Sequence, residues 1–257
     1  MKIECILMIM GLTGLASHAA VLSHYSFDSD YTDGSGNGND ATLTDVGTVG
    51  NSGITTTIGE SVFGGGAMEF STDRDYLAFS AQALNGDYTI SFWAQQDDAA
   101  RGWNMAIGER DTNVSFISLR GTGDDVVRWR GSEWVNTSPA SSQEEFASVS
   151  DTAWHHYAVV GAGTTISLYR DGTLVNTVAG ENTDFTVDTI GAAFFSANDF
   201  DFEGRIDEVW ILDEAADATT VSNLYTTNTL NGVPEPRTAM LASVAVLFLA
   251  RRRRKSV

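Results

Sequence analysis

The sequence predicts an all-β domain, a sandwich or a barrel, between two short targeting segments. Apolar and polar residues alternate in several stretches, as they do in half-buried strands. Glycine-rich and Asp-Gly turns separate these stretches at short intervals. The region between the targeting segments, residues 20–229, has the length of one such domain and contains one short stretch with helical spacing.

The clearest strand covers residues 88–94. Alternation there places Tyr88, Ile90, Phe92 and Ala94 on one face. Because these side chains are large and apolar, we expect that face to pack against the core.

Three further strands are expected at residues 155–160, 165–170 and 173–178. Gly161 to Gly163 separates the first two. Asp171-Gly172 separates the next two, and this dipeptide is favoured in two-residue hairpins whose central residues both have positive φ. Turns this short join antiparallel neighbours, so the three strands should form a meander.

Residues 206–212 supply another strand, and a short helix follows it. Asp217 is a typical N-cap, and Val221, Leu224 and Tyr225 recur at the spacing of one helical face.

Both ends of the chain predict export. At the N-terminus, Met1-Lys2 leads into an apolar stretch from Ile6 to Leu15, and small residues follow at Ser17 and Ala19. This order is typical of a signal peptide, residues 1–19, that signal peptidase would cut after Ala19.

The C-terminal segment, residues 230–257, carries a short motif, an apolar run and a basic end. The motif is Val233, Pro234, Glu235 and Pro236; the apolar run covers residues 238–250; and the basic end is Arg251, Arg252, Arg253, Arg254 and Lys255. Clustered cations stay in the cytoplasm, so the preceding domain should lie across the membrane. The apolar run is shorter than the roughly 17 residues that a spanning helix needs.

This arrangement resembles the PEP-CTERM sorting signal of Gram-negative bacteria. The resemblance implies an exosortase-type processing protease that acts at the Pro-Glu-Pro motif. The protein would then cross the inner membrane, remain anchored there transiently by its C-terminal segment, and end at the cell surface or in the extracellular matrix.

Charge narrows the choice of partners. Between Ala20 and Pro236 the chain has eight arginines, no lysine, and 33 of its 34 acidic residues, a net charge of −25. So negative a surface argues against nucleic acid and polyanionic ligands, and favours divalent cations or a neutral glycan. Cys5 lies in the signal peptide, so the exported chain forms no disulfide.

Several stretches in register resemble laminin G-like, concanavalin A-like domains of bacterial surface proteins. They are residues 24–28, 33–41, 64–70, 88–93, 154–158, 168–172, 202–209 and 223–225. The resemblance implies a two-sheet antiparallel jelly-roll sandwich, often with one structural calcium ion, and a face that binds glycans in some relatives.

Calcium prefers roughly six to eight oxygen ligands. The resemblance implies that Asp28 after the first strand, Asp207 in the last strand and a carbonyl of the glycine loop at Gly65 would supply them. Alternatively, Asp28 caps a turn and Asp207 is a surface residue. The stretch Asp33 to Gly38 resembles half of a calcium loop, but Thr44 stands where the loop needs an acid, so a turn is expected.

His155 and His156 suggest a metal-binding pair, but neighbouring strand residues point to opposite faces. The two imidazoles therefore should not converge on one ion; we expect one to pack in the interior and the other to lie at the surface.

Catalysis finds little support. Sandwich glycosidases of the laminarinase type carry Glu-x-Asp-x-x-Glu on one strand, and this chain has no such string. Glu203 and Asp207 share one face, whereas Glu208 points to the other. We therefore expect no enzyme.

The function expected from the sequence is carbohydrate binding. Trp103, Trp129 and Trp134 lie near glycines and polar residues and would stack on sugar rings, while Arg128 and Arg130 would hydrogen-bond sugar hydroxyls. Two alternatives stay open: a passive structural or adhesive matrix protein, in which these tryptophans pack under loops, and, less favoured, a glycoside hydrolase.

Overall fold

The computed structural model describes residues 21–46, 50–71, 74–98, 102–110, 115–119, 126–131, 143–146, 151–180, 182–193 and 201–230. The chain divides into two compact units, Ala20–Asn231 and the two terminal segments Met1–Ala19 and Gly232–Val257. The described residues belong to the first unit. Within them, no helix combines the length and the apolar character that a membrane span requires.

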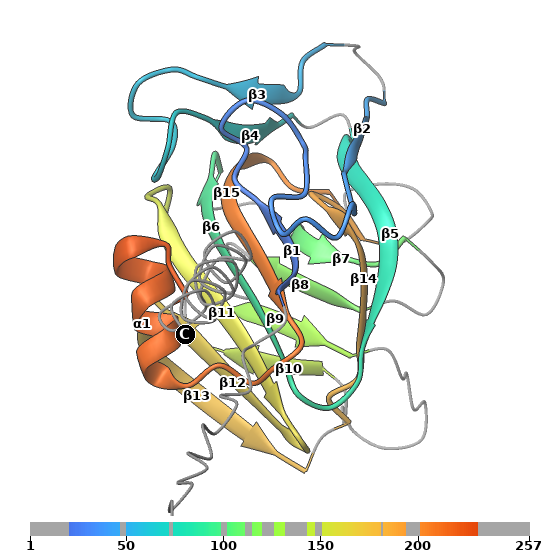
Figure 1. The fold of residues 1–257 in the computed structure, drawn as a ribbon, viewed down its shortest axis with the longest axis vertical. Coiled ribbons are helices and arrows are strands. Elements are labelled where there is room, and N and C mark those ends of the chain that lie inside the picture. The colour runs from blue at the N-terminus through green and yellow to red at the C-terminus, as the bar shows by residue number, and fades with distance from the viewer. Residues whose placement is uncertain are drawn as a thin grey trace, which may run out of the picture. The chain divides into compact units, whose positions relative to one another are not determined.

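Two antiparallel sheets lie face to face and form a sandwich (Figure 1). The first sheet has the order β13-β12-β11-β6-β15-β4-β3, and β1 also pairs with β15. Its strands are β1 (Val21–Tyr25), β3 (Gly53–Thr55), β4 (Ala67–Phe70), β6 (Tyr88–Gln96), β11 (His155–Ala162), β12 (Thr165–Arg170), β13 (Thr173–Ala179) and β15 (Gly204–Leu212).

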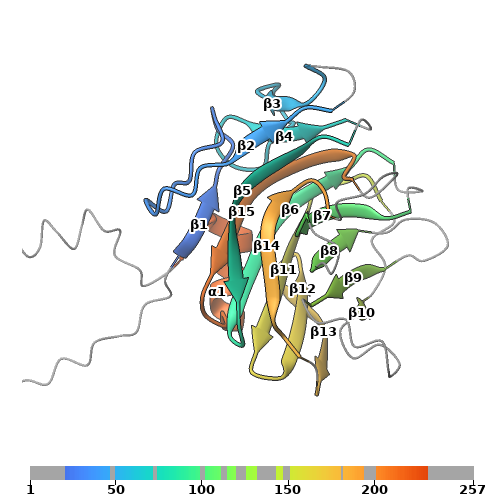
Figure 2. The ribbon, with the colours of Figure 1, turned by 90° about the vertical axis from the view of Figure 1, so that its right-hand side faces the viewer.

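The second sheet has the order β10-β9-β8-β7-β14-β5-β2 (Figure 2). Its strands are β2 (Thr42–Thr44), β5 (Tyr76–Leu84), β7 (Asn104–Gly108), β8 (Phe116–Leu119), β9 (Val127–Arg130), β10 (Gln143–Phe146) and β14 (Phe185–Ile190). The expected all-β sandwich is therefore confirmed.

The core fills the space between the sheets. Tyr88, Ile90, Phe92 and Ala94, the face expected from alternation, all belong to it and are at most slightly exposed. From the opposite sheet, Trp129 and Phe185 contribute large buried rings. Apolar area removed from water at roughly 25 cal/mol per Å² is the main source of the stability of such a core.

The expected meander is present as β11, β12 and β13. Gly163 turns the chain between β11 and β12 with φ +61°, and Asp171 and Gly172 turn it between β12 and β13 with φ +50° and +71°. Positive φ at both central residues is what a type I′ hairpin requires, and it explains the Asp-Gly sequence.

The helix α1 (Ala218–Thr227) begins at the expected cap. The Asp217 carboxylate accepts a hydrogen bond of 2.7 Å from the Thr220 N–H. Val221 and Leu224 are buried, and the Tyr225 ring stacks on Trp93 with 5.4 Å between centroids. Trp93 points away from the core face of β6, so α1 covers part of the outer face of the first sheet.

The loop that contains Asp33 is a turn, as expected. The buried Asp33 carboxylate accepts hydrogen bonds from the N–H groups of His24, Ser35 and Asn39 and from the Ser35 hydroxyl. Burial by itself raises the pKa of Asp33, but these donors outweigh it and lower the pKa below its usual value. The carboxylate therefore organises the loop after β1.

Candidate functional site

Asp28 and Asp207 hold the same short stretch of chain, Val62 to Gly65. Oδ2 of Asp207 accepts hydrogen bonds from the N–H groups of Val62 and Phe63 at 2.8 and 3.3 Å. Oδ1 of Asp28 accepts one from the Gly65 N–H. A side chain at Gly64 would clash with Asp28, since a Cβ there would lie 1.7 Å from Oδ1. The glycine loop is thus shaped to approach these carboxylates.

Asp207 also carries an unusual buried atom. Its side chain is fully buried, and Oδ1 has no hydrogen-bond partner. Burial raises the pKa of Asp207 to about 7, because the charged form is costly away from water. Such an atom is suited to a cation ligand, so the acidic residues here fit a calcium ion in part.

Side chains alone do not complete a metal site. In the described part of the chain, no group of three or more His, Cys, Asp or Glu is arranged to hold a metal. Gly65 is bound to Asp28 through its N–H. Any ion at Asp207 would therefore depend on backbone carbonyls and water for most of its roughly six to eight oxygens.

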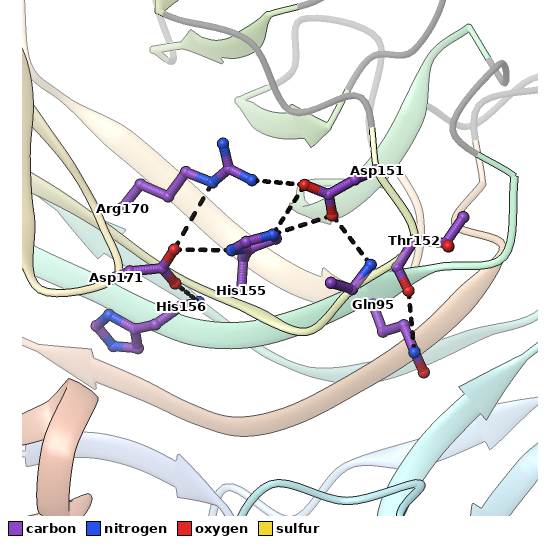
Figure 3. Close-up of polar contacts among 8 residues, drawn as sticks. Gln95, Asp151, Thr152, His155, His156, Arg170 and Asp171 are labelled. Carbon is purple, nitrogen blue, oxygen red and sulfur yellow. Dashed lines mark hydrogen bonds and ion pairs between the residues drawn. The ribbon is translucent and has the colours of Figure 1, made fainter.

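His155 and His156 point to opposite faces of β11, as expected (Figure 3). His156 is 1% exposed, and its Nε2 lies 2.8 Å from the Ser91 hydroxyl. His155 is half-buried and contacts Asp151 and Asp171. The two rings therefore contact different side chains and do not converge on one site.

The expectation that Trp129 stacks on sugar is wrong. Trp129 is 0% exposed and lies in the core between the sheets. Its Nε1–H donates a hydrogen bond of 3.0 Å to the Tyr88 hydroxyl, and its ring stacks on Phe185. In β9 it points inward, so its two neighbours, Arg128 and Arg130, point outward.

The outward side chains form a cluster that we call the tryptophan–arginine face. Its members are Trp103, Met105, Phe116, Arg128, Arg130 and Ala193. Trp103 lies edge-on to Phe116, with 6.1 Å between ring centroids and 84° between planes. The Cζ atom of Arg128 is 5.0 Å from the Trp103 ring centre, and that of Arg130 is 5.9 Å from the Phe116 ring centre. Trp103 remains partly exposed.

Two members of the tryptophan–arginine face are in energetically unfavourable states, one in its backbone conformation and the other in the burial of its charge. Trp103 has φ +53°, a region that a bulky residue rarely adopts. Arg130 is 3% exposed, and burial lowers the pKa of its guanidinium group. Strained backbone and buried charge persist where the surrounding structure holds them, and they are common at functional sites.

Sequence reasoning placed Trp103, Arg128 and Arg130 together but missed Phe116 and Met105. The pairing of β8 with β9 sets Phe116 opposite Arg130, and that of β7 with β8 sets Met105 opposite Ser118. Which of these strands pair, and in which register, cannot be predicted from the alternation of residues within a single strand. Trp134, the motif Val233 to Pro236 and the basic end Arg251 to Lys255 lie outside the described residues.

Comparisons with known proteins agree with this architecture. The family model described as Laminin_G_3, the concanavalin A-like lectin/glucanases superfamily, matches residues 70–222. A search of curated proteins gave no significant match.

Several solved structures share the fold. Domain 4 of AbnA, a GH43 extracellular arabinanase from Geobacillus stearothermophilus solved in complex with arabinotriose, has a TM-score of 0.60 and 20% identity, over 81% of this chain and 100% of that one. The binding domain of Paraclostridial Mosquitocidal Protein 1 has a TM-score of 0.55 and 16% identity, over 82% and 52%. The botulinum neurotoxin serotype G binding domain has a TM-score of 0.54 and 16% identity, over 80% and 50%. This chain spans about half of the two toxin domains.

Proposed function

We propose that this chain, which belongs to the concanavalin A-like lectin/glucanases superfamily, binds carbohydrate through its domain and catalyses no reaction on it. The tryptophan–arginine face is the proposed binding surface. The observation that carries the proposal is the partly exposed Trp103 ring, held beside a guanidinium group on an apolar floor. The arabinanase domain with the same fold, solved with arabinotriose, adds support.

The chemistry of this face suits a sugar ring. An aromatic ring stacks on the C–H face of a sugar through apolar area, while arginine N–H groups donate to hydroxyl oxygens. We propose a neutral or weakly charged glycan as the ligand, because the exported chain carries a net charge of −25 that repels polyanions.

The acidic residues of β15 support a non-catalytic role. Asp207 is fully buried and holds backbone N–H groups, and Glu208 is 4% exposed with its Oε2 2.7 Å from His24 Nε2. A glycosidase needs two carboxyl groups that flank one bond in an open cleft. These two carboxylates are committed to holding the fold instead.

A glycan array tests the proposal. Domain 20–231, with and without calcium, should retain a neutral glycan, and binding should survive high salt because a ring contact is not screened. Trp103→Ala should abolish retention, while Ile58→Ala, at a fully exposed residue in a loop of the other sheet, should not change it.

Three results would count against this function. Binding that weakens steeply with salt would mean an anionic ligand held by Arg128 and Arg130. Equal retention by the parent and Trp103→Ala would move the site elsewhere. If no glycan on a broad array is retained, the passive matrix protein becomes the better account.

We propose further that the protein is exported, anchored transiently and released from its anchor. The support is the order of motif, apolar run and basic end at residues 233–255, together with the signal-like residues 1–19. Protein recovered from the native cell surface should end near Pro236, which intact-mass measurement checks. A mass that includes Arg251 to Val257 would mean that the tail is a permanent anchor.

We also propose a structural calcium ion at Asp207 and Asp28. The unpartnered Oδ1 of Asp207 and the glycine loop that both carboxylates hold support it. The ion would neutralise the buried carboxylate and fasten the loop 62–65 to the last strand.

A further inference from the structure

A charged cluster surrounds His155 at the start of β11 (Figure 3). Its Nδ1 lies 2.7 Å from Oδ2 of Asp171, and its Nε2 lies 2.9 and 3.0 Å from the two carboxylate oxygens of Asp151. Arg170 donates from Nη2 to Oδ2 of Asp151 at 3.0 Å. Both ring nitrogens of one imidazole thus face carboxylates.

This geometry requires the charged form of the ring. A neutral imidazole has one N–H and one lone pair, so it donates to a single acceptor. Only the imidazolium donates to Asp171 and Asp151 together. When the ring loses its second proton, one nitrogen lone pair faces a carboxylate at less than about 3 Å, and that contact becomes repulsive.

The two carboxylates differ in how firmly they are held. Asp171 is fixed in the β12–β13 turn: its N–H donates to the His156 carbonyl, and its Oδ1 accepts from the His156 N–H. Asp151 precedes β11. Among the described residues, it contacts His155 and Arg170 of neighbouring strands and accepts a hydrogen bond from the Ala153 N–H of its own turn. Loss of the second proton should therefore weaken the Asp151 side.

Several other described residues lie around the His155 ring. Tyr157 of the same strand lies edge-on to it, with 6.4 Å between ring centroids. From β6, Ala94 stands opposite His155, and the uncharged Gln95 donates from Nε2 to the Thr152 carbonyl at 3.0 Å. From β12, Arg170 Nε lies 3.9 Å from Oδ2 of Asp171. In the part of the chain that the structure describes, the charged groups that face the ring are thus Asp151, Asp171 and Arg170.

We propose that His155 is a pH-dependent latch. While it is cationic, it strengthens the hold of the segment Asp151 to Ala153 on the β12–β13 turn, and when it becomes neutral, that hold weakens to the contacts that Arg170 and Gln95 still make. The latch is independent of the proposed glycan binding, because it involves no residue of the tryptophan–arginine face.

The latch also has an acid limit. Desolvation raises the pKa of Asp151, but the Ala153 N–H and the charges of His155 and Arg170 together lower it below the usual value. A carboxylate with a lowered folded pKa contributes stability above its unfolded pKa and loses it as the pH falls through the folded pKa. The hold on the segment is therefore also weakened in acid, as Asp151 becomes protonated.

NMR on domain 20–231, which forms a compact unit, tests the latch. The His155 ring signals give its titration midpoint directly, and the amide protection factors of Thr152 and Ala153 report the state of the segment. As the pH rises through that midpoint, protection should fall by about tenfold, the effect of losing one charge-assisted hydrogen bond at a partly exposed site.

Two variants make the test specific. His155→Gln cannot become a cation, so the protection of Thr152 and Ala153 should be low and independent of pH near the parent midpoint. His156→Asn, the adjacent histidine on the other face, should keep the parent response. Unchanged protection across the His155 midpoint, or the same pH dependence in His155→Gln, would overturn the latch.

Discussion

At the scale of single residues, burial separates two tryptophans that look alike in the sequence. Both Trp103 and Trp129 have arginines, glycines and polar residues nearby in the chain or in the fold. Trp129 points between the sheets and pairs with Tyr88, whereas Trp103 stays partly exposed beside Arg128. One is a structural residue, and the other is the proposed contact to sugar.

Trp129→Ala should destabilise the domain by about 3 to 5 kcal/mol, because it leaves a large cavity in the core. Trp129→Phe should cost less, mainly by leaving the buried Tyr88 hydroxyl without its donor, at about 1 to 3 kcal/mol. Urea unfolding measures both free energies. Trp103→Ala is the matched control and should cost less than Trp129→Ala; equal costs would contradict the burial difference.

The burial of His156 predicts that the domain loses stability as the pH falls. Burial lowers the pKa of His156 from 6.5 to about 4, because the charged ring is costly away from water. The unfolded chain then binds more protons between these values, so stability is fully present above pH 6.5 and is lost as the pH falls toward 4. From pH 7 to pH 4.5 this group alone should remove about 2 kcal/mol.

His156→Asn tests this assignment. The loss of unfolding free energy between pH 7 and pH 4.5, measured with urea, should be about 2 kcal/mol smaller in the variant than in the parent. A variant that loses as much stability as the parent would show that other groups cause the loss of stability in acid.

At the scale of elements, the turns fix how the first sheet is assembled. The β12–β13 turn uses positive φ at Asp171 and Gly172, and the same Asp171 side chain binds His155 and the His156 N–H. A single Asp-Gly dipeptide therefore shapes the hairpin and ties it to β11. The hairpin also meets α1, because Gly172 faces the Tyr225 ring.

Gly172→Val should destabilise the domain by about 1 to 3 kcal/mol, since a β-branched residue is strained at positive φ. A Cβ there would also lie 2.9 Å from Cδ1 of Tyr225. Gly163→Val is a matched control, because Gly163 has φ +61° but no atom within 4 Å of such a Cβ. Thermal unfolding should rank Gly172→Val as the more damaging change, and the reverse order would contradict the packing against Tyr225.

At the scale of the whole domain, the first and last strands lie side by side without a disulfide. β1 pairs with the end of β15 from Val21 opposite Leu212 to Tyr25 opposite Val209. The start of β15 pairs with β4, and Asp207 between them holds the loop that precedes β4. This central strand therefore links regions that are far apart in the chain.

If the proposed calcium ion binds there, it should raise the stability of domain 20–231 by mass action. At a hundredfold excess over the dissociation constant the gain is about 2.7 kcal/mol, and chelation should reverse it. Calorimetric melting measures the shift. Asp207→Ala should lose the response, and Asp30→Asn, an exposed carboxylate in a turn, should keep it; an equal response in Asp207→Ala would exclude Asp207 as a ligand.

The sequence by itself determined the fold class, the meander and its Asp-Gly turn, the capped helix and the core face of β6. These features depend on alternation and on turn and cap residues that are neighbours in the chain, so a short stretch of sequence is enough to predict them. It also predicted that His155 and His156 diverge, because a strand alternates its side chains.

Only the tertiary structure decided which aromatic side chains meet solvent and which carboxylates meet a partner. Trp129 is buried because β9 turns that face toward Tyr88 and Phe185, and Arg130 faces Phe116 because β8 pairs with β9 in that register. Asp151 and Asp171 reach one histidine from two separate segments. Pairing between distant strands sets these contacts, and nothing in either strand alone specifies its partner or register.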